Sequence, residues 1–328
     1  MLSRSPKRRR SIDASGADLL GLAAALGIRA QFLAQLAPHS GVGVGGPADL
    51  LVVANSCEEL VSAIRLAGSF GVEWRVYGGL TNMLLPDSGL RGLVVLNHAR
   101  GYRFGEDHRL TAEAGAAMVK VARDAVQRGW GGLTWAVGLP GTVGGAVVNN
   151  AGAFGGEISE TLRTAEILMP DGQVEVVDAG WFEFRYRYSR LKGSERRCVV
   201  LSVEFQLEPR SVEHLTAKAR EYTERRQRTQ PPGKTLGSTF KNPADDYAGR
   251  LLDAAGLKGA REGGFVVSTR HANFFINEGG GTAADYRRLM QRAQDAVCEQ
   301  FGVLLEPEIE IVPEEAPDLA LVEVEDGE

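Results

Sequence analysis

The stretch Gly129–Gly156 reads GWGGLTWAVGLPGTVGGAVVNNAGAFGG and contains ten glycines among 28 residues, without a repeating unit. Only glycine enters positive φ freely and lets successive backbone N–H groups approach phosphate or carbonyl oxygens closely. The segment therefore favours backbone held against a ligand. A set of tight turns in a β-rich domain explains the same residues equally well, so both interpretations stay open at this point.

The bulk composition indicates a globular protein of two or three compact units. The chain has 328 residues, of which 44% are hydrophobic and 24% charged, enough to bury a substantial core. Its 37 basic and 42 acidic residues give a net charge of -5, but five of the basic residues lie within 1–10 and seven of the acidic ones within 314–328. The remaining balance gives no electrostatic reason to expect a nucleic-acid partner. We expect a disordered basic tail over 1–17 and an acidic tail over 314–328.

The cysteines and the apolar runs indicate the compartment. Cys57, Cys198 and Cys298 are far apart and form no Cys-x-x-Cys pair, which fits a reducing environment. No apolar region follows the basic start directly, as it does in a secretory signal, and no apolar run approaches membrane-spanning length. The five histidines show no metal-ligand spacing. We therefore expect a cytoplasmic protein with no membrane segment and no metal.

A βαβ unit is predicted in the first third of the chain. Strands are expected at 49–54, 74–77 and 93–96, and Ser56 begins a helix between the first two. The second strand runs into Gly78-Gly79-Leu80-Thr81-Asn82, a loop at the carboxyl end of a strand, where α/β sheets usually bind ligands. Further strands are expected at 109–114, 164–169, 174–177, 199–207, 265–267, 274–277 and 304–312, and further helices at 117–128, 211–228, 248–255 and from 282 onward.

Two phosphate-binding patterns fail on their context. Gly41–Gly46 matches G-x-G-x-x-G, but a proline-containing segment precedes it and Pro47 follows, so the strand and helix that a dinucleotide fingerprint needs are missing. A turn that enters the strand at 49–54 is the better interpretation. Gly233-Lys234-Thr235 resembles the end of a P-loop, but Arg228 occupies the place of its first glycine, which argues against an NTPase of that type.

Three later segments carry candidate chemistry. Phe184–Lys192 alternates basic and aromatic residues in a strand-like run, which places Arg185 and Arg187 on one face, either solvated or facing an anionic substrate. Gly237–Pro243 surrounds small hydroxyl groups with glycine and proline, which is typical of a turn or a fixed loop. In Glu306–Glu310 acids alternate with apolar residues. This row either faces solvent or is turned by its proline so that the middle glutamate points at a cleft.

Taken in chain order, nine segments make this sequence similar to the UDP-N-acetylenolpyruvoylglucosamine reductase family. They are 43–49 (GVGGPAD), 78–82 (GGLTN), 138–145 (GLPGTVGG), 150–156 (NAGAFGG), 186–189 (YRYS), 237–243 (GSTFKNP), 247–250 (YAGR), 271–273 (HAN) and 305–308 (LEPE). The similarity covers roughly residues 39–312, and the order and spacing of the segments make it specific. It implies an α+β fold: a two-lobed FAD-binding domain of the vanillyl-alcohol oxidase type at 18–210, with lobes at about 18–101 and 102–210, and a C-terminal α+β substrate-binding lobe at 211–313.

The resemblance also implies a reaction. In this family a bound FAD is reduced by NADPH and then reduces an enolpyruvyl UDP-sugar in peptidoglycan synthesis, with one site serving both ligands in turn. The absence of a dinucleotide fingerprint agrees with such a shared site. Ser238 matches the family's proton donor, Arg187 the arginine that faces the developing charge, and Glu308 the catalytic glutamate. We expect the protein to act as a monomer.

The remaining site residues follow by the same position-by-position comparison. Contacts with FAD are implied for Gly78, Gly79, Leu80, Thr81, Asn82, Met83, Gly138, Gly141, Thr142, Val143, Gly144, Gly145, Asn150, Gly152 and Gly156, and contacts with substrate for Tyr186, Lys241, Asn242 and Arg250. Leu80 stands where the family commonly has glycine or serine, so a bulkier side chain lies beside the pyrophosphate loop and puts the affinity for FAD in question.

Another FAD-dependent oxidase or dehydrogenase of the same superfamily explains the glycine loops but not the three catalytic residue types. A catalytically silent flavin- or nucleotide-sugar-binding module also leaves those three residue types unexplained.

Overall fold

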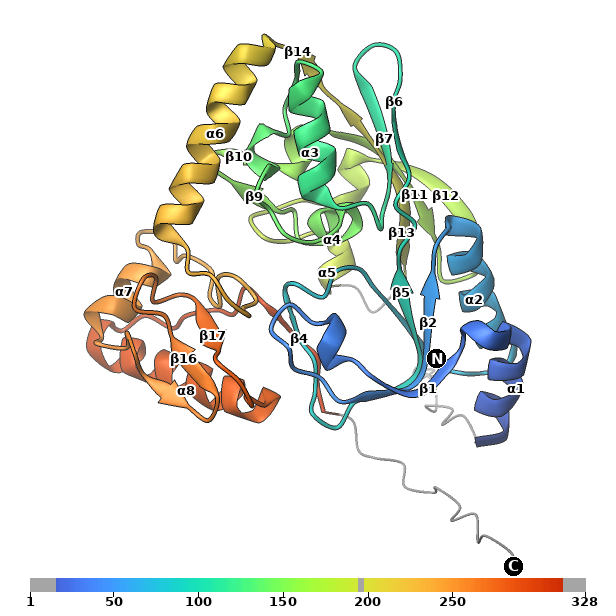
Figure 1. Ribbon diagram of the computed structural model, residues 1–328, viewed down its shortest axis with the longest axis horizontal. Coiled ribbons are helices and arrows are strands. Elements are labelled where there is room, and N and C mark those ends of the chain that lie inside the picture. Colours follow the sequence, from blue (N-terminus) through green and yellow to red (C-terminus); the bar gives the residue numbers. More distant parts are fainter. Residues whose placement is uncertain (1–15, 194–197, 315–328) are drawn as a thin grey trace, which may run out of the picture.

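In the computed structural model, which describes residues 16–193 and 198–314, the first group of elements is a four-stranded sheet of order β1-β2-β5-β3. Its strands are β1 (Gln31–Gln35), β2 (Pro47–Ala54), β3 (Trp74–Tyr77) and β5 (Leu90–Asn97). Strands β2 and β3 both run parallel to β5, whereas β1 is antiparallel to β2. Helices α1 (Gly16–Leu26) and α2 (Cys57–Ser69) pack on one face of this sheet (Figure 1).

Local sequence signals explain why α2 lies where it does. The Ser56 hydroxyl accepts a hydrogen bond from the Glu59 N–H at 3.2 Å, which caps the first turn of the helix. Leu60, Ile64 and Ala67 repeat at helical spacing and are buried against the sheet. The helix connects β2 to β3, so the loop that follows β3 lies at the carboxyl edge of the parallel strands.

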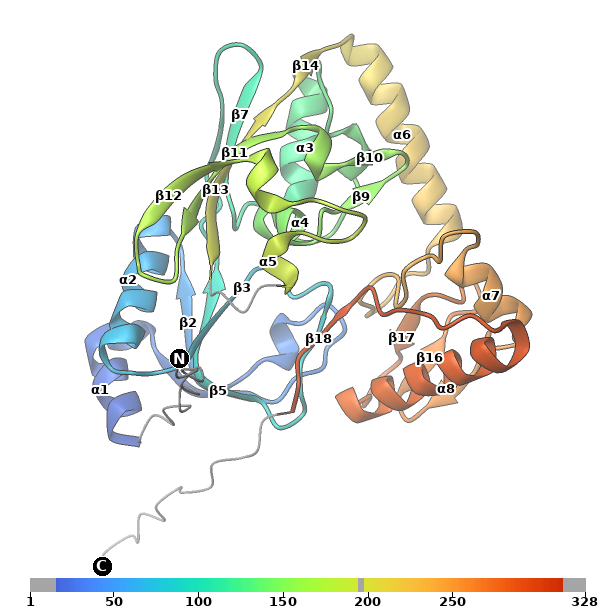
Figure 2. The ribbon, with the colours of Figure 1, turned by 180° about the vertical axis from the view of Figure 1, so that it is seen from behind.

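The second group is a five-stranded antiparallel sheet of order β12-β11-β13-β7-β6. Its strands are β6 (Tyr102–Phe104), β7 (Arg109–Glu113), β11 (Leu162–Leu168), β12 (Val174–Asp178) and β13 (Val199–Gln206). Helix α3 (Met118–Gln127) covers it with five buried apolar residues, the same five that its helical spacing predicts. The short helices α4 (Val143–Val148) and α5 (Arg190–Gly193) lie at the end of this sheet that faces the first group (Figure 2).

The third group follows helix α6 (Val212–Thr229), which runs along one side of the molecule (Figure 1). It contains α7 (Ala248–Ala254), α8 (Ala283–Phe301) and a small antiparallel sheet of β15 (Arg261–Glu262), β16 (Phe265–Val267) and β17 (Phe275–Asn277). Helix α8 begins with a capping box between Thr282 and Asp285. The chain then returns to the first group, where β18 (Glu310–Ile311) pairs in parallel with β4 (Met83–Leu84) (Figure 2).

Two further small pairs complete the described strands: β8 (Trp130–Gly131) with β14 (Glu208–Pro209), and β9 (Gly152–Ala153) with β10 (Gly156–Glu157). The α+β class is confirmed, and so are most of the predicted helices and strands. Two strand predictions are wrong. Residues 184–192 form a tight turn followed by α5 rather than a strand, and only the last part of 304–312 is strand. The predicted tails lie outside the described residues, apart from Gly16, Ala17 and Glu314.

Candidate functional site

Two glycine-containing loops lie against each other beneath the return of the chain to β18. One is the loop at 78–82 after β3, and the other is the segment at 138–142 that leads into α4. A Cβ added to Gly79 would lie 3.3 Å from the Cα of Gly141, and one added to Gly78 would collide with the Oγ1 of Thr142. Glycine is therefore favoured at Gly79 because the two backbones approach closely, and at Gly78 because the Thr142 side chain occupies the space of a Cβ.

The loops present a row of backbone donors that have no acceptor among the described residues. In the described part of the chain, the N–H groups of Gly79, Leu80, Thr81 and Asn82 donate no hydrogen bond, and neither does that of Gly141. Groups of this kind are rarely left without a partner when they are half-buried. Successive amide donors of this kind suit an anionic ligand, and the diphosphate of a dinucleotide cofactor fits such a cradle.

The bulky residue in the first loop does not occupy this cradle. Leu80 has φ +47° and a side chain that is only 3% exposed. It packs in the core together with Leu36, Leu85 and Leu90. Because its side chain is buried in the core, Leu80 places no bulk beside the amide donors.

Arg187 lies in a tight turn that the alternating sequence did not predict. Arg185 and Tyr188 exchange backbone hydrogen bonds of 3.1 and 3.0 Å, and Arg187 has φ +54°. The turn is fastened to the end of α4, since the Asn150 amide donates to the Arg185 carbonyl at 3.1 Å. The Ser189 hydroxyl donates to the carbonyl of the last α4 residue at 2.7 Å. Arg185 and Arg187 therefore do not share a strand face.

The turn directs Arg187 at Glu308. Its Nε lies 2.8 Å from the Glu308 carboxylate, and its Nη2 donates to the Gly152 carbonyl at 2.7 Å. The two side chains are 19% and 20% exposed. The guanidinium also lies 4.9 Å from the centre of the Tyr186 ring, which is itself half exposed. The structure thus brings together two of the three residues predicted to be catalytic, from positions 121 residues apart in sequence.

Burial and charge act in opposite directions on Glu308. Burial raises the pKa of Glu308 above its ordinary value, while the charges of Arg187, Lys192 and Lys241 lower it. The net shift is upward. The pair is therefore an ion pair with little solvent, in which the proton affinity of the carboxylate depends on the surrounding cations.

Ser238 reaches the same region through backbone pairing. It faces Phe274 in an isolated β-bridge, and the next residue, Thr239, accepts a hydrogen bond from the Glu308 N–H at 2.8 Å. The pairing continues with Phe240 opposite Pro307. The Ser238 side chain is partly exposed, and its hydroxyl has no partner among the described residues. It is one residue from the backbone contact with Glu308.

Several predicted cofactor residues have structural reasons for their identity. Asn150 is fully buried, and its Oδ1 accepts from the Ser159 N–H at 3.0 Å, so both ends of its amide are used inside the protein. A Cβ on Gly156 would collide with the Trp135 indole, and one on Gly138 would lie 2.8 Å from the Cδ of Arg226 in α6. These positions shape the wall of the site through its backbone and packing.

The four predicted substrate residues differ in their placement. Tyr186 and Lys241 lie near the Arg187–Glu308 pair, and Lys241 also forms a 3.2 Å ion pair with Glu306. Asn242 accepts a hydrogen bond from the Ala248 N–H at the start of α7. Arg250 is paired with Asp246 on the surface of α7.

Lys192 belongs to this site although no role was predicted for it. Its Nζ donates to the Asn149 Oδ1 at 2.8 Å and to the Glu308 carbonyl oxygen at 3.3 Å. The side chain is 15% exposed, and burial lowers the pKa of Lys192. Its position at the end of the basic run 184–192 was visible in the sequence, but the turn that brings it here was not.

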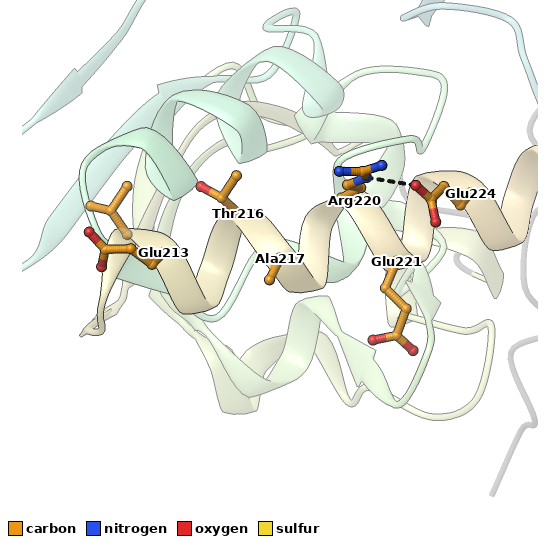
Figure 3. A pocket seen from close by; sticks show the side chains of 7 residues that line it. Glu213, Thr216, Ala217, Arg220, Glu221 and Glu224 are labelled. Carbon is orange, nitrogen blue, oxygen red and sulfur yellow. Dashed lines mark hydrogen bonds and ion pairs between the residues drawn. The ribbon is translucent and has the colours of Figure 1, made fainter.

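A shallow hollow elsewhere on the surface is unrelated to this site. It follows the outer face of α6, where Glu213, Arg220, Glu221 and Glu224 point outward and Arg220 pairs with Glu224 (Figure 3). None of the predicted site residues lines it. No helix in the described ranges is both long and apolar enough to cross a lipid bilayer.

The fold and the amide-lined loops are those of a FAD-binding oxidoreductase. A family described as FAD binding domain matches residues 48–178. A second, described as UDP-N-acetylenolpyruvoylglucosamine reductase, C-terminal domain, matches residues 227–312. The chain belongs to the UDP-N-acetylenolpyruvoylglucosamine reductase family, as relatives along nearly its whole length show.

Three relatives illustrate the extent of the similarity. The reductase of Rubrobacter xylanophilus is 44% identical over 287 residues, which cover 87% of this chain and 96% of that protein. The reductase of Caldicellulosiruptor saccharolyticus is 39% identical over 274 residues, or 83% and 88% of the two chains. The crystal structure of UDP-N-acetylenolpyruvylglucosamine reductase from Thermus caldophilus matches with a TM-score of 0.74 and 33% identity, and covers 87% of this chain and 98% of that one.

Proposed function

We propose that this chain catalyses the FAD-dependent, NADPH-driven reduction of the enolpyruvyl group of UDP-N-acetylglucosamine enolpyruvate to give UDP-N-acetylmuramate, in the cytoplasm. The observation that carries the proposal is the Arg187–Glu308 pair, which lies in the same region as the unpartnered amides of the 78–82 loop. Asn82 connects the two features, because its side-chain amide donates to the Glu308 carbonyl at 3.4 Å.

The cradle residues would hold FAD through its diphosphate, by the amides of the 78–82 loop and of Gly141. Bound there, FAD would supply hydride transfer, with NADPH as the source and the terminal carbon of the enolpyruvyl group as the acceptor. Electron density then accumulates on the neighbouring carbon and the carboxylate of the substrate. The residues of this chain must stabilise that charge and supply a proton.

Arg187 is suited to the first task. Its guanidinium is always charged and is oriented by Glu308 and by the Gly152 carbonyl before substrate arrives. A donor fixed in advance in a site with little water stabilises developing charge more effectively than a mobile one. Glu308 holds the guanidinium in place and contributes to the hydrogen-bond network around the substrate carboxylate.

Ser238 is suited to the second task. A hydroxyl is a weak acid, but a carbanionic carbon is a strong base and takes its proton when the geometry is fixed. The Ser238 hydroxyl is free of partners among the described residues, so no competing internal acceptor holds its proton. Tyr186 and Lys241 would contact the substrate, with Asn242 and Arg250 as more distant contributors. The proposed division into a FAD-binding domain at 18–210 and a substrate-binding domain at 211–313 places Ser238 and Glu308 in the second domain and Arg187 in the first.

An anaerobic experiment on the purified protein in two steps tests this proposal. NADPH should bleach the bound flavin, and the enolpyruvyl UDP-sugar should restore its colour. Ser238→Ala should leave the first step unchanged and slow the second by about 10²- to 10⁴-fold, because only the second step needs the proton. Ser62→Ala, a change of the same chemistry on α2, serves as the control.

Three outcomes would contradict the proposal. A Ser238→Ala enzyme that reoxidises at the parental rate would remove the serine from its role. A flavin that is not reoxidised by the UDP-sugar, but that an alcohol reduces and air rapidly reoxidises, would identify another type of FAD-dependent oxidase. A colourless, folded protein that does not bind added FAD would exclude both the reductase and the other FAD-dependent oxidase.

A further inference from the structure

Lys192 forms a bridge between two parts of the chain that carry different catalytic candidates. It lies in α5, five residues after Arg187. Its ammonium donates to Asn149 at the end of α4 and to the main-chain carbonyl of Glu308 on the returning C-terminal segment. The Lys192 side chain is 15% exposed, so its charged form carries a desolvation penalty. Hydrogen bonds of this kind offset that penalty.

The Glu308 residue is held at each of its polar groups. Its N–H donates to the Thr239 carbonyl, its carboxylate accepts from Arg187, and its carbonyl accepts from both Lys192 and Asn82. Of these contacts, only the one from Lys192 carries a full positive charge to the backbone. Loss of that charge would leave a half-buried carbonyl with a single weak donor at 3.4 Å.

The positive charges around Glu308 come from three neighbouring segments. Arg187 faces it from the turn, Lys192 from α5 and Lys241 from the Gly237–Pro243 loop. On its own segment Glu310 lies 4.0 Å from Lys192, and Glu306 pairs with Lys241. Two cations other than Arg187 therefore act on the carboxylate, and of the two only Lys192 also contacts the Glu308 backbone.

We propose that Lys192 is a positioning residue for the reduction of the UDP-sugar: it fixes the Glu308 backbone against the end of α4 and thereby orients the carboxylate that holds Arg187. The Lys192 charge also acts on that carboxylate and lowers the pKa of Glu308. This inference rests on the proposed function. It assigns Lys192 no direct contact with substrate or flavin. It predicts that the residue affects the step that uses Glu308 and leaves flavin reduction intact.

The test uses the FAD-loaded enzyme and measures the two half-reactions separately by stopped-flow absorbance across a range of pH. Lys192→Met removes the charge at nearly constant length and should slow reoxidation by the UDP-sugar about 10- to 100-fold, with flavin reduction by NADPH within about twofold of the parent. The Glu308 limb of the pH profile, defined as the limb that Glu308→Gln abolishes, should move to higher pH because a neighbouring cation is gone. Lys192→Arg restores a cation with several donors and should return that limb to its parental position.

Controls separate the possible failures. Lys258→Met removes a lysine that pairs with Asp253 on the surface and should change neither half-reaction. If Lys192→Met fails to retain FAD, Lys192→Gln replaces it, with the same expected movement of the limb and a smaller loss of rate. The inference is overturned if Lys192→Met and Lys192→Gln reoxidise with the UDP-sugar at the parental rate and with the parental pH profile. It is also overturned if they lose rate while the Glu308 limb of the pH profile stays in place. Failure of the parent enzyme itself to reoxidise with the UDP-sugar instead counts against the proposed function.

Discussion

Replacing Asn150 with alanine tests whether this residue holds the Arg187 turn. Asn150 is fully buried, and its φ is +41°. Its side chain joins two segments, since Nδ2 donates to the Arg185 carbonyl at 3.1 Å and Oδ1 accepts from the Ser159 N–H at 3.0 Å. The variant leaves one backbone acceptor and one backbone donor without these partners.

The cost can be estimated from these contacts. Each backbone group left unsatisfied by the substitution costs about 1 kcal/mol at the lower end of the measured range. Asparagine tolerates the left-handed conformation better than alanine does, which adds roughly 1 kcal/mol of backbone strain. We therefore expect Asn150→Ala to lower the free energy of unfolding by about 3 kcal/mol.

A second variant separates the two contributions. Asn150→Gly loses the same hydrogen bonds but relaxes the positive φ, so it should be about 1 kcal/mol more stable than Asn150→Ala, less the entropy cost of the added glycine. Urea unfolding of the apoprotein gives both values through the midpoint and the slope. Asn55→Ala, at an exposed position before α2, is the matched control and should change stability by about 0.5 kcal/mol or less.

Turnover supplies the functional half of the test. A loosened turn misplaces Arg187. Both Asn150 variants should therefore slow reoxidation of the flavin by the UDP-sugar at a temperature where they remain folded. An Asn150→Ala protein with parental stability would show that the two hydrogen bonds contribute nothing. Parental turnover combined with reduced stability would show that the turn holds its shape without Asn150.

Glu308→Gln should raise the free energy of unfolding of the apoprotein at neutral pH, because burial raises the pKa of Glu308 and the folded state disfavours its charged form. The parental stability falls as pH rises from the ordinary glutamate value through the raised value, so the advantage of the variant should appear over that window and vanish below it, as urea unfolding at several pH values will show. Gly78→Ala should weaken FAD binding about tenfold or more, measured by fluorescence titration of the apoprotein, because the new methyl collides with the Thr142 hydroxyl beside the amide cradle.

Each of these two predictions has a clear contrary result. A Glu308→Gln protein whose stability advantage is independent of pH would mean that the charge of Glu308 is not the cause. For the glycine, the control is Gly68→Ala in α2, where an added Cβ meets nothing within 4 Å. Equal FAD affinities for the two alanine variants would exclude the close approach of the loops as a requirement for binding.

The sequence predicted those elements whose signals are local. Helix α3 follows from five apolar residues at helical spacing, all of which are buried. The β11–β12 hairpin follows from Asp171-Gly172, where Gly172 has φ +85°. Each of these signals lies within a few residues of the structure it determines, so no long-range contact is needed to interpret it.

The C-terminal segment shows where local signals stop. Alternation of acids and apolar residues predicted a strand over 304–312, but only Glu310–Ile311 pairs with β4, while Phe240 faces Pro307 from another group of elements. The segment divides its pairing between two partners. The change comes between Glu308, whose N–H donates to the Thr239 carbonyl, and Glu310, whose N–H donates to the Asn82 carbonyl. The alternating pattern indicates that the residues are extended but does not say which partner each one has.

The Arg187 turn shows a second limit. Alternating basic and aromatic residues favour a strand, yet contacts from α4 and its end place Arg187 at positive φ. Leu80, Asn150 and Phe154 also adopt positive φ although none is glycine, and all four lie in the loops or turns that form the candidate site or its wall. Such conformations cost free energy and persist only where surrounding contacts over-determine them. Because those contacts come from residues far away in sequence, the strain cannot be inferred from any local pattern. Four of the eight described non-glycine residues with positive φ lie at this site, and the contacts that hold them are formed within the protein itself.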